Sequence, residues 1–107
     1  HAQSLEVIGY AGVLGEWELV ATVTKDEATP AGEFSGALTM THVGICTQDG
    51  PEQRTGEIRF RIAAPRLDAT LSLAGLECTY SAALTDAYTG QMICPGRAAL
   101  PLKLWLR

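Results

Sequence analysis

The sequence predicts an all-β domain: a small antiparallel barrel of seven or eight strands that follow one another as a meander. Most of the chain alternates apolar and polar residues with period two, which is typical of strands with one buried face. Short turn-forming stretches separate these segments, and no segment keeps a helical apolar period for more than two turns. A β-sandwich has the same signature; we favour the barrel because a continuous meander needs no long crossover.

The clearest local prediction is a hairpin over residues 76–94 that turns near Asp86. Folding the chain there places Cys78 opposite Cys94 on one face. The same register adds further pairs to this apolar face: Tyr80 with Met92, Ala82 with Gly90, and Leu84 with Tyr88. The other face is polar, so we expect the hairpin to pack one face on a core and to expose the other to water.

The remaining strands are expected over residues 5–10, 16–25, 34–46, 57–62, 67–73 and 100–107. In the second of these, Trp17 shares a face with Leu19, so we expect its side chain to be buried. The most polar stretch, 47–55, is expected to be an exposed turn.

Length and charge narrow the class of protein. A chain of 107 residues predicts a single domain that spans 1–107. Acidic residues outnumber basic residues, 12 to 8, and the basic residues are scattered, which argues against nucleic-acid binding and against docking on anionic lipid. No apolar run approaches the roughly 18 residues of a membrane span.

Three cysteines predict one disulfide and one free thiol, as in a small secreted domain. We expect the bridge Cys78–Cys94, whose loop of about 15 residues stabilises the fold by roughly 3 kcal/mol. A Cys46–Cys94 bridge stays open as an alternative, as do three reduced thiols in a cytosolic protein. His1 and Ala2 fit the end of a signal-peptidase site, and equally the remainder of a tag. The prediction is a periplasmic or secreted protein.

Three soft metal donors lie on one face of an expected strand: Met40, His42 and Cys46. Such ligands suit copper or zinc, although a histidine that faces a core is more often held there by a hydrogen bond. The only other histidine is His1, and no nucleophile, base and orienting residue form a motif. We expect no enzyme activity and no cofactor, with soft-metal binding as an alternative function.

Gly15-Glu16-Trp17 resembles the start of the first strand in calycin barrels, the group of lipocalins, avidins and small bacterial metalloprotease inhibitors. In that group the tryptophan closes one end of the barrel. The resemblance implies an inhibitor-like or ligand-binding protein rather than an enzyme. The chain also departs from the pattern, because calycins place an arginine of the final strand against this tryptophan. Here Arg107 is expected to face outward and Arg97 lies in a turn, and the cysteine spacing differs from that of the inhibitors.

The function we expect is binding, most directly of a protein partner or of a second copy. Trp105 faces outward on the last strand, which we expect to be an edge strand. Pro101 predicts that this strand starts at an edge or at a bulge, because proline lacks an amide donor. Tyr80, Tyr88 and Phe34 share the predicted interior, where they either pack or line a cavity. A carrier of a small hydrophobic ligand is therefore a further alternative.

Overall fold

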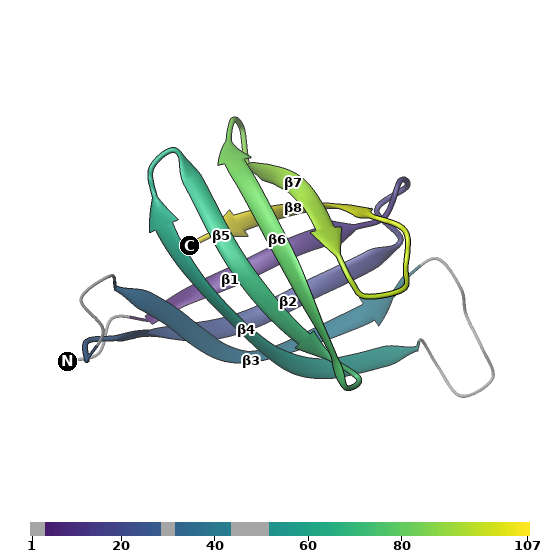
Figure 1. Ribbon diagram of the computed structural model, residues 1–107, viewed down its shortest axis with the longest axis horizontal. Helices are drawn as coiled ribbons and strands as arrows, with labels where there is room; N and C mark the ends of the chain where they lie inside the picture. Colours follow the sequence, from purple (N-terminus) through teal and green to yellow (C-terminus); the bar gives the residue numbers. More distant parts are fainter. Residues whose placement is uncertain (1–3, 29–31, 44–51) are drawn as a thin grey trace.

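Eight strands close into one antiparallel barrel in the computed structural model, which describes residues 4–28, 32–43 and 52–107 (Figure 1). The strands are β1 (Ser4–Ala11), β2 (Trp17–Asp26), β3 (Glu33–His42), β4 (Gln53–Ala63), β5 (Arg66–Leu73), β6 (Leu76–Leu84), β7 (Tyr88–Ile93) and β8 (Leu100–Leu106). Each strand pairs with the next, and β8 pairs with β1. The predicted meander barrel is confirmed, and the chain does not form the alternative sandwich.

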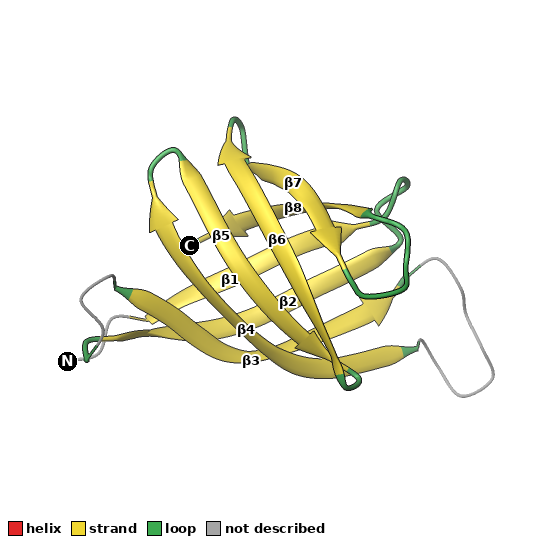
Figure 2. Ribbon diagram, viewed as in Figure 1, coloured by secondary structure: helices red, strands yellow, loops and turns green. Residues whose placement is uncertain are grey.

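The secondary structure of the described residues consists of strands joined by turns and loops (Figure 2). None of these residues forms a helix of the length and apolar character needed to cross a membrane.

The expected alternation decides which side chains fill the barrel. In β5 the buried residues are Leu67, Ala69, Leu71 and Leu73, and the residues between them face outward. The same period of two holds in β2, where Leu19, Ala21 and Val23 are buried. Apolar residues thus occupy the inside of the closed sheet, and burying their side chains is the main stabilising contribution to the fold.

The predicted register of the 76–94 hairpin is confirmed. Tyr80 pairs with Met92. Two residues earlier in β6, Cys78 forms a disulfide with Cys94. Only the end of the predicted apolar face differs: Leu84 is the last residue of β6, next to the β6–β7 turn, and its side chain is exposed.

Three further expectations need correction. β4 begins at Gln53, so residues 53–55 belong to a strand and not to the predicted polar turn. β3 ends at His42 within the described chain, and Cys46 lies outside the described residues. β8 is not an edge, because it pairs with both β7 and β1. Proline is tolerated in this closed position because Pro101 is only the second residue of the strand.

One row of paired residues explains how the interior is organised. The row joins Phe34, Phe60, Ala69, Tyr80, Met92 and Leu100 across six neighbouring strands. Strands in a barrel tilt relative to its axis, so such a row winds from one end of the barrel to the other. Phe34 therefore lies at one end and Leu100 at the opposite end, although the register aligns them.

The two ends differ. We call the end that carries Trp17, the β5–β6 turn and residues 94–99 the mouth; it lies to the right in Figure 1. The other, packed end carries the β4–β5 and β6–β7 turns. There the Phe34 and Phe60 rings stack with centroids 5.3 Å apart, and Leu67 is completely buried beside the β4–β5 turn. Large side chains thus fill the packed end.

Candidate functional site

The mouth contains a pocket of about 530 Å³. Residues from β2 to β8 line it: Trp17, Met40, Arg54, Leu73, Ala74, Leu76, Cys78, Met92, Cys94, Arg97, Ala98 and Leu100. A pocket of this size lies within the roughly 300–1,000 Å³ typical of small-molecule sites. The barrel is therefore hollow at the mouth.

Apolar side chains form the walls of the pocket. Met40 and Met92 are buried deep in it, where they face inward from β3 and β7. Leu73 and Leu76 flank the β5–β6 turn at the rim, and Leu100 begins β8. Methionine side chains are flexible and polarizable, and so they adapt to ligands of different shape.

A two-residue turn joins β5 to β6 at the mouth. Ala74 and Gly75 both have positive φ, 50° and 81°, as a type I′ hairpin turn requires. This turn twists with the strands, so that Leu73 and Leu76 pair directly. The sequence Leu-Ala-Gly-Leu thereby places two leucines at the entrance.

The Cys78–Cys94 disulfide forms part of the pocket wall. The sulfur atoms are 2.01 Å apart, and the Cα atoms 4.3 Å apart. Cys78 is fully buried in β6, and Cys94 directly follows β7. The bridge therefore ties the connection over the mouth to the barrel wall, and it is consistent with an extracellular or periplasmic location.

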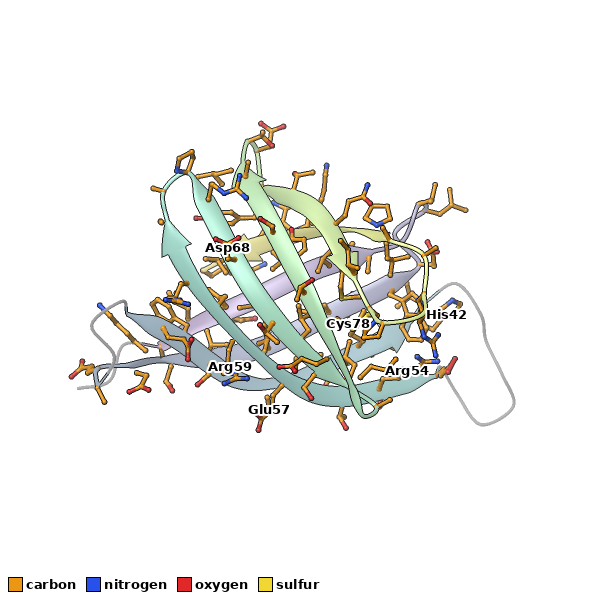
Figure 3. All side chains as sticks on the ribbon, viewed as in Figure 1. His42, Arg54, Glu57, Arg59, Asp68 and Cys78 are labelled. Carbon is orange, nitrogen blue, oxygen red and sulfur yellow. A yellow bond between two sulfur atoms is a disulfide. The ribbon has the colours of Figure 1, made fainter. Side chains whose placement is uncertain are left out.

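Among the described residues, two arginines are the only charged residues that line the pocket. Arg54 extends from β4 with its guanidinium 5.3 Å from the centroid of the Trp17 ring system, and it also lies 3.3 Å from a carboxylate oxygen of Glu52 (Figure 3). Arg97 is exposed in the β7–β8 connection, where its backbone N–H donates to the Cys94 carbonyl at 3.2 Å. The Arg97 side chain makes no ion pair with any other residue of the described chain.

Trp17 lies at the rim between Arg54 and His42. The Trp17 and His42 rings meet edge to face, with centroids 4.6 Å apart. Trp17 packs against the core but is only half-buried, so the expectation of a fully buried side chain is wrong. The first residue of β2 is too close to the mouth to be covered on all sides. An arginine does contact this tryptophan, but it comes from β4 and not from the final strand of the calycin pattern.

The predicted interior residues are held in the core and do not line the pocket. Phe34 stacks on Phe60 at the packed end. The Tyr80 hydroxyl lies 2.7 Å from the Leu102 carbonyl oxygen and 3.1 Å from that of Tyr88, and it shares its proton between them. Burial raises the pKa of Tyr80 above the usual tyrosine range. Tyr88 is buried nearby.

The proposed soft-metal ligands are only partly described. Met40 points into the pocket and His42 contacts Trp17, while Cys46 lies outside the described residues. Within the described chain, no three His, Cys, Asp or Glu side chains gather in a metal-binding arrangement. The metal site stays a prediction.

Trp105 faces outward, as expected, and is 38% exposed. Its ring meets that of Tyr10 edge to face, with centroids 5.9 Å apart. This pair lies on the outside of the barrel, on β8 and β1, and is separate from the pocket.

Sequence reasoning gave neither pocket arginine a binding role: it left Arg97 in a turn and missed Arg54. Arg54 was missed because residues 47–55 were assigned to a turn. In the structure it belongs to β4 and lies on the same inward face as Gly56, Ile58 and Phe60. Extending that alternation backward along the chain would have placed Arg54 at the mouth.

No protein-family model, curated protein sequence or solved structure matches the chain. The closed eight-stranded meander is compatible with a calycin-like barrel.

Proposed function

We propose that this protein binds a small, mainly apolar molecule that carries an acidic group. The apolar part occupies the mouth of the barrel, and the acid binds at Arg54 and Arg97. A single observation carries the proposal: the pocket has apolar walls, and both of its charged residues are arginines.

The walls favour an apolar ligand because binding would remove apolar surface on both partners from water. Met40, Met92 and Leu100 line the pocket beside the disulfide, and none of these groups offers a strong hydrogen bond. A polar molecule would lose hydration here without replacing it. The ligand therefore needs an apolar body.

The arginines favour an acidic group at the entrance. A guanidinium binds carboxylate or phosphate through two parallel hydrogen bonds, and its charge is permanent at physiological pH. Arg54 is held in place by Trp17 and Glu52, whereas Arg97 has no ion-pair partner among the described residues. The chain has a net charge of −4, so this positive entrance contrasts with the protein as a whole.

Matched ligands test both parts of the proposal. Replacing Trp105 by Phe leaves Trp17, which lines the pocket, as the only tryptophan. Its fluorescence is followed during titration with dodecanoate, dodecanol and dodecyltrimethylammonium, each below its critical micelle concentration. We expect dodecanoate to bind most tightly, dodecanol more weakly and the cation most weakly.

Arginine variants separate the acid from the apolar body. Arg54→Gln and Arg97→Gln should each weaken dodecanoate binding roughly ten- to hundredfold, since a hydrogen bond to a charged group is worth about 1.5–3 kcal/mol. Dodecanol affinity should not change. Arg59→Gln is the control, because Arg59 is an exposed outer-face arginine paired with Glu77. Equal binding of acid and alcohol would refute the acidic group, and no binding of either would refute the ligand site itself.

The calycin resemblance supports the same proposal, since that group includes carriers of small ligands. A secreted or periplasmic carrier without enzyme activity, in which the disulfide persists, fits this function. Binding of copper or zinc stays an alternative, and native mass spectrometry of protein from its own host would reveal a bound metal.

The protein partner expected from the sequence would bind elsewhere, on the outer face around Trp105. Inhibitor-like binding of such a partner stays a second candidate, favoured by the exposure of Trp105 and Tyr10. Because this face lies outside the barrel, partner binding and ligand binding are separable. Mutation of Trp105 should leave ligand affinity unchanged.

A further inference from the structure

An apolar patch lies on the outside of the barrel over β8, β1 and β2. It consists of Trp105, Ile8, Val20 and Tyr10. Trp105 is 38% exposed, Tyr10 42% and Val20 41%, although side chains on the outer face of a barrel are usually polar. On the outer face of β4 to β6 the corresponding positions carry Arg59, Thr70, Thr79 and other polar groups. The patch is thus a local feature of one face.

The register arranges this face in two parallel rows. Trp105, Ile8 and Val20 are paired partners across the three strands and form the first row. Lys103, Tyr10 and Glu18 form the second row, one pleat nearer the mouth. In both rows β1 is in the centre. In the second row, Lys103 therefore lies on the β8 side of Tyr10 and Glu18 lies on its β2 side.

We propose that this patch is the contact surface between two copies of the chain, related by a two-fold axis that runs along β1. Such an axis exchanges the two flanks, so that β8 of one copy faces β2 of the other. Lys103 then lies opposite Glu18 of the second copy, and Trp105 opposite its Val20. Ile8 and Tyr10 lie near the axis and pack on their own counterparts.

The distribution of charge favours a second copy over an unrelated protein. The outward cations on the β8 side of this face are Lys103 in β8 and Arg107 directly after it, and Glu18 is on β2. A surface that is positive on one flank and negative on the other is complementary to itself under this symmetry. Glu6 lies closer to the axis and faces its own counterpart; this pair of acids opposes the contact. Two backbone hydrogen bonds place the cationic residue Arg107 next to Glu6 on the β8 side.

The closed sheet determines how the copies meet. Both β1 and β8 are paired on each side, so neither offers a free backbone edge to a second copy. The contact is therefore made by side chains, with tryptophan and tyrosine as the main anchors.

Sedimentation equilibrium from low micromolar to millimolar concentration tests the proposal. We expect a monomer–dimer equilibrium. Trp105→Ala and Tyr10→Ala should each raise the dimer dissociation constant roughly tenfold or more. Both residues are exposed, so circular dichroism should show that these variants fold. A chain that stays monomeric over the whole range would overturn the proposal.

Exchanging the charges tests the symmetry itself. Lys103→Glu alone places two acids opposite each other, and Glu18→Lys alone places two cations opposite each other, so each should weaken the dimer. The double variant restores opposite charges and should restore the dissociation constant. Arg59→Glu, on the polar outer face, is the control and should have no effect. If the double variant were as weak as the single variants, a two-fold axis along β1 would be wrong.

Discussion

The two ends of the barrel are built by the same strands with the same alternation, yet one is filled and the other is hollow. At the packed end Phe34 and Phe60 stack across neighbouring strands, and Leu67 lies beneath the turn. At the mouth the inward positions carry methionine, leucine and arginine around a pocket. Alternation thus determines which way a side chain faces, and the size of the side chain and its distance from the rim determine whether the space is filled.

The strongest test of this difference compares the same substitution at both ends. Leu67→Ala should lower the free energy of unfolding by about 3–4 kcal/mol, because Leu67 is fully buried and its neighbours cannot close the cavity. Leu100→Ala should lower it by about 1 kcal/mol, because Leu100 is half-buried and already borders a pocket. Urea unfolding measures both. Equal losses would mean that the mouth is as tightly packed as the opposite end.

A second prediction concerns the disulfide, which stabilises the mouth where packing does not. Replacing both Cys78 and Cys94 by alanine should lower the free energy of unfolding by roughly 3 kcal/mol. Hydrogen exchange should then accelerate first around Cys94 and least around Phe60, because the lost bridge ties down only the mouth. Peptide mapping of unreduced protein checks the bridge itself. Three alkylatable thiols in native protein would contradict it.

The smallest expected effect concerns Tyr80, whose hydroxyl contacts two backbone carbonyls between the two ends. Tyr80→Phe should lower the free energy of unfolding by about 1 kcal/mol at neutral pH.

The same residue predicts a pH dependence. Because burial raises the pKa of Tyr80, the folded state keeps this proton when the unfolded state releases it. The contribution is complete below about pH 10, the usual tyrosine pKa, and is lost as the pH rises above it. Alkaline unfolding should be steeper in the native protein than in Tyr80→Phe. Identical alkaline profiles would contradict a buried, proton-retaining phenol.

Much of this architecture could be read from local pattern. The register of the 76–94 hairpin follows from period-two alternation about one turn, and it placed Cys78 beside Cys94. The outward direction of Trp105 followed from the parity of Leu104 and Leu106. These predictions succeed because the alternation of inward and outward side chains along a strand depends on local sequence and not on distant contacts.

The site was harder to predict because it depends on the tilt of the strands. Phe34, Tyr80 and Met92 belong to one row of paired residues, and sequence reasoning placed all three in one interior without assigning them to an end of the barrel. Tilt carries the row along the barrel axis, so only Met92 reaches the pocket. Arg54 was missed for a local reason, since a strand that begins within a polar segment lacks the usual signal. The closure of β8 on β1, which removed the expected edge, is a property of the whole chain.

That seam between β1 and β8 also has a consequence for biosynthesis. Among the described strands β1 leaves the ribosome first and β8 last, so Val7 must wait for its partner Leu106 until nearly all of this sequence has been made. Until then both β1 and β7 present unpaired backbone and an incomplete apolar face, which are the features that promote misassembly of nascent chains. A protein of this topology depends on late closure, and a chaperone or translocation pathway that keeps the chain extended would suit it well.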